Sequence, residues 1–112
     1  MDCLFCKFVS GEIEPQKVFE NESVLGFVDI NPQAKEHYLF VSKSHSENVN
    51  AMTTKPGDIE AVFTAIKEFT ESNELAKNGF RVVTNLGPHG CQSVFHTHFH
   101  VLGGEQLRGF GS

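Results

Sequence analysis

Three histidines on alternate residues form the stretch of this sequence with the most evident chemistry. They are His96, His98 and His100, and the run that holds them ends at a pair of glycines. The intervening residues are largely aromatic or β-branched, a pattern that predicts a β-strand. Because successive side chains of a strand point to opposite faces, the three imidazoles should share one face, about 6.6 Å apart along the backbone. The other face should be apolar core, formed by Phe95, Phe99 and Val101.

This row of imidazoles is compatible with more than one chemistry. A single strand histidine is usually a hydrogen-bonded structural residue, but three in register carry desolvation and repulsion costs that leucine would not have. Histidines in an H-x-H pair also bind zinc or iron from a strand, and imidazole is the commonest metal ligand. Nucleophilic or acid–base chemistry on a phosphate is the third alternative. The row alone leaves the metal site and the phosphate chemistry open.

A second unusual feature is the Cys-x-x-Cys pair of Cys3 and Cys6. A redox dithiol of this kind should follow a strand inside a βαβ unit, and there is no room for one before Cys3. Half of a Cys2His2 zinc site is the second interpretation, since the chain has histidines to complete it, among them His45 after a predicted strand. Two incidental cysteines are the remaining alternative. The spacing favours zinc over redox chemistry.

Length and charge narrow the class of protein that must hold these residues. A chain of 112 residues predicts one domain, and a net charge of −5 argues against an extended nucleic-acid surface while leaving a small nucleotide possible. No apolar run approaches the ~20 residues of a membrane span. The first residues lack the pattern of a signal peptide, so we expect a cytoplasmic protein with reduced thiols.

A small set of predicted elements must position the histidines and cysteines. A short helix ended by Gly11 should carry the two cysteines, and a long helix is predicted from Pro56 to Lys77, where five apolar residues fall at helical spacing. Short turns between strands indicate an antiparallel α+β fold with five strands, one long helix and one short helix, in a single domain over residues 1–112. The first four strands are predicted at residues 17–20, 24–29, 37–41 and 80–85.

Two loops carry residues that can meet a ligand. Asp29 lies at a strand end, where a carboxylate can accept hydrogen bonds from ligand hydroxyls, although a turn-forming role is commoner. The loop at residues 86–93 has glycines at 87 and 90, which let the backbone approach a ligand and direct N–H groups at phosphate oxygens. A glycine-rich loop alone is equally typical of a simple turn.

Taken together, these residues resemble the histidine triad nucleotide hydrolases. The segment from His96 to Leu102 fits the family signature HφHφHφφ, with Thr97 as a weaker apolar choice than usual. The resemblance is to the Hint branch, the purine nucleoside phosphoramidases, and it covers essentially the whole chain in the right order. The other matching segments are Asp29-Ile30-Asn31-Pro32-Gln33-Ala34 with His37, Asn85-Leu86-Gly87, Gly90-Cys91-Gln92-Ser93-Val94 and Gly103-Gly104.

The resemblance implies a homodimer with a continuous sheet, and hydrolysis of the P–N bond in purine nucleoside 5′-phosphoramidates (AMP or GMP amides) without Mg²⁺. By position, His98 would be the nucleophile and would form a nucleotidyl-histidine that water then cleaves. His100 and His37 match residues that contact the phosphate and its leaving group, and Ser93 matches one that hydrogen-bonds the departing amine. Asp29 would bind the ribose hydroxyls. The other implied nucleotide-binding residues are Asn85, Cys91 and Gln92 near the phosphate, and Phe5, Phe8, Phe27 and Ile30 around the base.

The resemblance also implies a metal. Some bacterial-type members, and the related galactose-1-phosphate uridylyltransferases, pair an N-terminal Cys-x-x-Cys with two histidines, which by position are His45 and His96 here. One structural Zn²⁺ per chain, bound by Cys3, Cys6, His45 and His96, is therefore expected, because Cys2His2 is a closed tetrahedral set.

Two departures from the family pattern leave the leaving group open. Cys91 stands where glycine is usual, and the tail at residues 107–112 lacks the tryptophan-bearing end of the Hint proteins. A dinucleoside polyphosphate hydrolase, as in the Fhit-like branch, is an alternative, although Gly103-Gly104 favours the Hint branch. The alternative from another class is a nucleotide-binding scaffold with incidental catalysis.

Overall fold

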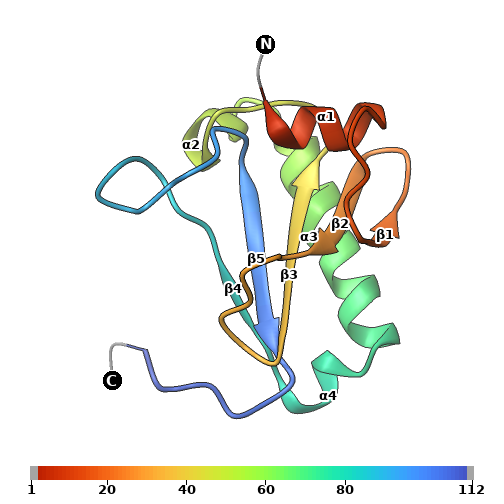
Figure 1. Cartoon of the computed structure of the whole chain (residues 1–112), viewed down its shortest axis with the longest axis vertical. Coiled ribbons are helices and arrows are strands. Elements are labelled where there is room, and N and C mark those ends of the chain that lie inside the picture. The colour runs from red at the N-terminus through yellow and green to blue at the C-terminus, as the bar shows by residue number, and fades with distance from the viewer. Residues whose placement is uncertain (1–2, 111–112) are drawn as a thin grey trace.

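An antiparallel sheet of five strands forms the centre of the computed structural model, which describes residues 3–110. The strand order is β1-β2-β3-β5-β4, so the histidine strand β5 lies between β3 and the edge strand β4 (Figure 1). This confirms the predicted α+β class with a five-stranded antiparallel sheet. The strands are β1 Lys17–Glu20, β2 Val24–Val28, β3 Glu36–Ser42, β4 Arg81–Val83 and β5 His98–Gly103.

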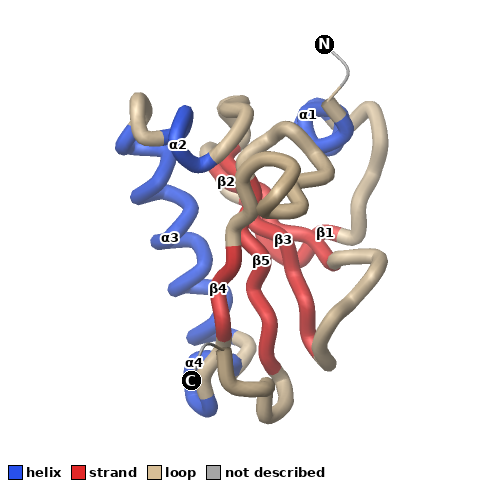
Figure 2. The backbone as a smooth tube through the Cα atoms, turned by 90° about the vertical axis from the view of Figure 1, so that its left-hand side faces the viewer, coloured by secondary structure: helices blue, strands red, loops and turns tan. Residues whose placement is uncertain are grey.

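Helices cover both faces of this sheet. Figure 2 shows α3 along one side and α1 on the other side, near one end of the strands. α1 is Leu4–Ser10, and it ends at Gly11, whose φ of 83° is the left-handed conformation that the prediction of a helix stop requires. The long helix is shorter than predicted, because Glu74 has a φ of 68° and separates α3 from α4. The remaining helices are α2 Val49–Met52, which was not predicted, α3 Pro56–Ser72 and α4 Leu75–Asn78.

The hydrophobic core is divided by the sheet into two clusters. The larger packs α3 against the sheet, with Val62, Ile66 and Phe69 buried against Phe99 and Val101 of β5. The smaller packs α1 against the opposite face, where His98 and His100 also project. Its buried members are Cys3, Phe5, Leu25, Phe27, Leu39 and Val41. The alternation of β5 therefore separates apolar core from imidazoles as predicted.

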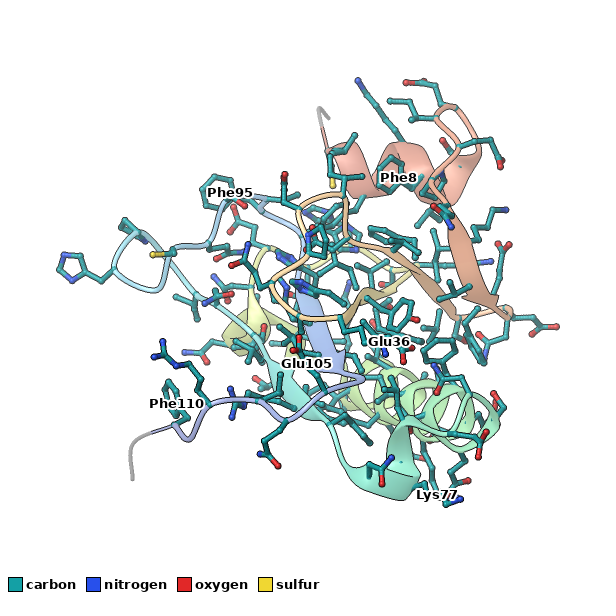
Figure 3. All side chains as sticks on the ribbon, turned by 60° about the horizontal axis from the view of Figure 1, so that its bottom comes forward. Phe8, Glu36, Lys77, Phe95, Glu105 and Phe110 are labelled. Carbon is teal, nitrogen blue, oxygen red and sulfur yellow. The ribbon has the colours of Figure 1, made fainter. Side chains whose placement is uncertain are left out.

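The start of the histidine strand differs from the prediction. β5 begins only at His98, and Phe95 is 61% exposed instead of facing the core (Figure 3). Thr97 is buried, with 2% exposure, and its backbone N–H donates to the carbonyl of Ser46 at 2.8 Å, outside the sheet ladder. His96 therefore lies in a loop at the head of the strand. Among the residues described, no helix is both long and apolar enough to cross a membrane.

Candidate active site and metal centre

The structure brings Cys3, Cys6, His45 and His96 into one cluster. Their candidate ligand atoms all lie within 4.8 Å of one another. The Sγ of Cys3 is 3.3 Å from His96 Nδ1, Cys6 Sγ is 3.3 Å from His45 Nδ1, and the two Nδ1 atoms are 3.1 Å apart. The cysteines come from the start of α1, His45 from the loop after β3, and His96 from the head of β5. Three segments distant in sequence therefore converge on one point.

The donor set fits a tetrahedral ion. Zinc bonds of ~2.3 Å to sulfur and ~2.0 Å to nitrogen place tetrahedral ligands about 3.3–3.8 Å apart, close to the separations in this cluster. The Nε2 of His96 lies 2.9 Å from the Ser42 carbonyl, which can only accept a hydrogen bond. That bond fixes the proton on Nε2 and leaves Nδ1 free to coordinate a metal. Burial lowers the pKa of His96 to about 4 and raises that of Cys6 to about 11, where the adjacent Cys3 thiol adds to the effect.

His98 lies at the junction between this cluster and a pocket. It is buried, and its Nδ1 is 2.8 Å from the backbone carbonyl of His96. Nδ1 must therefore carry the proton, so Nε2 has a free lone pair. Its ring makes a T-shaped contact with that of Phe5, with the ring centroids 5.1 Å apart. This tautomer is the one that a nucleophilic imidazole needs.

A second histidine pair, His37 and His100, has tautomers set by a backbone amide. The N–H of Gln33 donates to His37 Nδ1 at 2.9 Å, so the proton of neutral His37 lies on Nε2. That Nε2 is 2.8 Å from His100 Nδ1, which must accept, and the proton of His100 is then on its own Nε2. Asp29 Oδ2 is 3.3 Å from His37 Nε2 and 3.8 Å from His100 Nδ1. The chain of contacts leaves His100 with an N–H donor.

The two imidazoles of this pair are held neutral. Burial, together with the neighbouring His98 and His37, lowers the pKa of His100 to about 4, and Asp29 opposes this shift. Burial also lowers the pKa of His37, again against the carboxylate of Asp29. The side chains of Asp29, His37 and His100 lie close enough together to hold a metal. Because Nε2 of His37 carries a proton, however, they fit a metal less well than the Cys2His2 cluster does.

The depressed pKa of His100 predicts how stability changes with pH. Its ordinary value is 6.5, so between 6.5 and about 4 the unfolded chain binds the proton that the folded protein excludes. The free energy of unfolding should be highest above pH 6.5 and fall as the pH falls toward 4. His100→Gln, which does not titrate, should reduce this fall by at most about 3 kcal/mol. Urea denaturation of the wild type and the variant between pH 4 and about 7 measures the free energy of unfolding. An equal pH dependence in the two proteins would contradict the depressed pKa of His100.

An apolar pocket of about 520 Å³ is connected to these histidines through two of its lining residues. No histidine lines it, but Phe5 contacts His98, and Asp29 contacts His37 and His100. The pocket lies between α1 and the strand end at Asp29, and the aromatic rings in it contact one another; the centroids of Phe8 and Phe27, for instance, are 5.1 Å apart. All five residues predicted for the base and ribose line it: Phe5, Phe8, Phe27, Asp29 and Ile30. Sequence reasoning missed the other lining residues, which are Leu4, Ile13, Glu14, Pro15, Gln16, Val28 and Leu39.

The glycine-rich loop is held by Gln92. Its side-chain carbonyl accepts from the N–H of Gly87 at 3.0 Å, and its amide donates to the backbone carbonyls of Glu47 and Val94. Cys91 has a φ of 65°, which explains in physical terms why glycine is usual at this position. A Cβ on Gly90 would lie 2.4 Å from the Leu86 carbonyl oxygen, so only glycine fits there.

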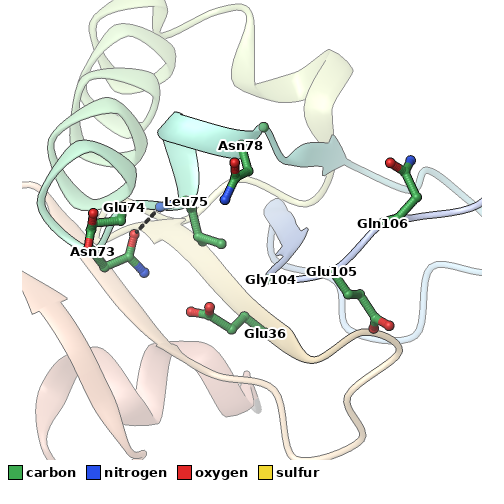
Figure 4. A pocket seen from close by; sticks show the side chains of 9 residues that line it. Glu36, Asn73, Glu74, Leu75, Asn78, Gly104, Glu105 and Gln106 are labelled. Carbon is green, nitrogen blue, oxygen red and sulfur yellow. Dashed lines mark hydrogen bonds between the residues drawn. The ribbon is translucent and has the colours of Figure 1, made fainter.

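Ser93, Cys91 and Asn85 are absent from the lining of the apolar pocket. Ser93 is exposed and lines a separate hollow with Val94 and Phe95, on the outer side of the metal cluster. Asn85 is partly buried. Another hollow, of about 500 Å³, lies at the far end of β5 around Glu36, Glu74 and Glu105, and none of the histidines lines it (Figure 4).

Several supporting residues could not be identified from the sequence. Thr84 Oγ1 donates to the backbone carbonyl of His98 at 2.9 Å. The ammonium group of Lys55 donates to Ser44 Oγ and to the carbonyl of His45, both at 2.9 Å, and so fixes the loop of that metal-cluster histidine. Their partners, two backbone carbonyls and one serine hydroxyl, are brought close by the tertiary fold, so no local pattern signals them.

Comparison with known proteins agrees with this geometry. A family model described as the HIT domain matches residues 10–107. A 14 kDa zinc-binding protein of Zea mays is 39% identical, covering 93% of this chain and 83% of its own. An adenylylsulfatase HINT1 of Arabidopsis thaliana is 37% identical, covering 93% and 72%. The structure of a histidine triad protein from Clostridium difficile superposes with a TM-score of 0.94 at 36% identity, covering 98% and 96%.

The fold and the site together define a histidine triad protein. The chain belongs to the HIT domain family, and its relatives support the Hint-like branch.

Proposed function

We propose that the protein is a nucleotide hydrolase that cleaves the P–N bond of purine nucleoside 5′-phosphoramidates through a covalent nucleotidyl-histidine. The observation that carries this proposal is the tautomer of His98. Its Nδ1 donates to the His96 carbonyl, so the lone pair of Nε2 is available beside a pocket of nucleoside dimensions. The relative named adenylylsulfatase supports an adenylyl substrate, and the family supports a hydrolase.

In the proposed mechanism, Nε2 of His98 attacks the α-phosphorus. The P–Nε2 bond forms as the P–N bond to the amine breaks, and the amine leaves with a proton donated from Nε2 of His100. Water then attacks the same phosphorus and breaks the P–Nε2 bond, its proton returns to His100, and the nucleoside monophosphate leaves neutral His98 behind. The proton on Nε2 of His100, maintained by His37, supplies a donor to the phosphoryl oxygens or the leaving group. Ser93 is proposed to hydrogen-bond the departing amine.

The nucleoside is proposed to lie in the apolar pocket. Phe5, Phe8, Phe27 and Ile30 would enclose the base, because purines stack favourably on aromatic rings. Asp29 would accept hydrogen bonds from the ribose hydroxyls through its carboxylate. The phosphate would then lie against the glycine-rich loop, which Asn85, Cys91 and Gln92 shape, where backbone N–H groups replace a magnesium ion.

We also propose that the Cys2His2 cluster holds one structural zinc ion. The donor set and the bond from His96 to Ser42 support zinc, as does the zinc-binding relative. When bound, the ion supplies a cross-link between α1, the loop after β3 and the head of β5. A homodimer, with the sheet continued across two copies, is also proposed.

A comparison of three substrates tests the proposed reaction. A tryptamine phosphoramidate of adenosine should be cleaved faster than diadenosine polyphosphate, with AMP and tryptamine as products. Adenosine 5′-phosphosulfate is the third substrate, because of the adenylylsulfatase relative. Faster cleavage of the polyphosphate would support the alternative hydrolase. AMP binding without turnover of any substrate would support the scaffold and contradict the proposal.

A further inference from the structure

Ser46 and Thr97 form a buried pair that neither the proposed chemistry nor the metal cluster uses. Their hydroxyl oxygens are 2.7 Å apart, and the hydroxyl of Thr97 is also 3.1 Å from the Ser46 carbonyl. That carbonyl accepts from the backbone N–H of Thr97 as well, at 2.8 Å. A carbonyl only accepts, so Thr97 donates its hydroxyl proton to it and Ser46 donates to Thr97. Every proton of this contact therefore has a defined partner.

The pair connects the metal cluster to His98 along the chain. Residues 45 and 96 place their side chains in the cluster, and the next residue of each segment, Ser46 and Thr97, bond to one another. The residue after Thr97 is His98. These contacts replace the sheet ladder for the segment before β5, since the strand begins only at His98.

His96 also acts on His98 through its backbone. Its side chain belongs to the cluster, while its carbonyl oxygen accepts the Nδ1 proton of His98 at 2.8 Å. A rotation of the peptide between His96 and Thr97 would turn that carbonyl away and remove the bond that fixes the tautomer. The hydrogen bonds from Thr97 to Ser46 restrain this peptide on one side, and the cluster restrains it on the other.

We propose that Ser46 and Thr97 are positioning residues for His98. They hold the peptide before the nucleophile, and so keep its lone pair on Nε2 and directed at the substrate. They also link the order of the metal cluster to the orientation of His98. A buried hydroxyl pair is suited to this role because hydrogen bonds are directional, whereas apolar packing would tolerate the rotation. The effect on turnover rests on the proposed function; the effect on the tautomer does not.

Thr97→Val tests the inference, because it removes the hydroxyl and nearly preserves the shape. We expect kcat for the adenosine phosphoramidate to fall by about tenfold to a hundredfold, as for misplaced catalytic groups, while KM and the affinity for AMP change by less than about threefold. In ¹⁵N NMR of the histidine side chains, the Nδ1–H signal of His98 should be lost or broadened. Thr70→Val is the matched control. Thr70 is equally buried, but its hydroxyl bonds to Ile66 within α3.

Two further variants make the outcome decisive. Thr97→Ser keeps the hydroxyl and should restore most of kcat and the Nδ1–H signal. Ser46→Ala removes only the bond between the two hydroxyls and leaves the bonds from Thr97 to the Ser46 carbonyl, so kcat and the Nδ1–H signal should fall in the same direction but by less. It decides the question if Thr97→Val does not fold. Unchanged kcat and an unchanged His98 signal in the folded variants would overturn the inference, as would equal losses in Thr97→Val and Thr97→Ser. If the wild type fails to cleave the phosphoramidate, the proposed function fails, and the NMR signal still tests the positioning role.

Discussion

Replacing His98 with alanine is expected to reduce turnover of the adenosine phosphoramidate by roughly four orders of magnitude or more. The expectation follows from the covalent mechanism, in which no other described group offers its lone pair beside the pocket. His100 presents a proton at Nε2, and Nε2 of His37 bonds to His100. Neither can take over the attack on phosphorus without rearranging its hydrogen bonds.

Binding should largely survive this substitution. The pocket is lined by α1, residues 13–16, the end of β2 with the two residues after it, and Leu39 of β3, and not by His98. The dissociation constant for AMP should therefore change by no more than a few fold, which isothermal titration can measure. His89→Ala is the matched control, since this exposed histidine lies on the glycine-rich loop away from the cluster. Substrate labelled at the α-phosphate should label the wild-type protein and leave the variant unlabelled. Turnover within about tenfold of wild type in His98→Ala would refute the nucleophilic role.

Loss of one metal ligand is expected to have the largest effect on stability. Purified without chelators, the wild-type protein should contain about one zinc per chain, and Cys6→Ser should contain far less. Because the ion cross-links three distant segments, the variant should lose several kcal/mol and at least about 10 °C in Tm. Elemental analysis and calorimetry measure the two quantities.

Cys91→Ser provides the control for this experiment. Cys91 is a free, exposed cysteine of the glycine-rich loop and is not a member of the cluster, so its loss should leave zinc content and Tm close to wild type. A wild-type protein with well under one zinc per chain would contradict the metal assignment. Equal zinc content in Cys6→Ser and Cys91→Ser would contradict the ligand set.

Local patterns were sufficient to predict much of the fold, whereas the grouping of the site residues was predicted from the resemblance to the histidine triad family. The alternation of β5 correctly separated Phe99 and Val101 from His98 and His100, because strand periodicity is a property of the backbone alone. The glycine stop of α1 likewise depends on local conformation. Roles carried over from the family, such as those of Ser93 and Asn85, remain predictions.

Features that depend on tertiary contacts could not be predicted. The sequence pattern predicts that the strand includes the residues before His98. In the structure, however, the backbone N–H of Thr97 donates to the Ser46 carbonyl and not to a neighbouring strand. One continuous helix was predicted from Pro56 to Lys77, yet Glu74 adopts a left-handed conformation that separates α3 from α4. The tautomer of His37 depends on the amide of Gln33, a backbone group that any residue would supply.

The short helix α1 contributes to both the proposed zinc site and the proposed nucleotide pocket, and so would couple binding at the two sites. Its seven residues are too few to be stable alone, so its order must come from the core and, under the proposal, from a zinc ion at its first turn. The same helix supplies Phe5 and Phe8 to the pocket. The proposed zinc and the proposed nucleotide would each favour the state in which α1 is docked, and thermodynamic linkage would then require each to raise the affinity for the other. Under the proposed function, zinc supply would set the nucleotide affinity of this protein.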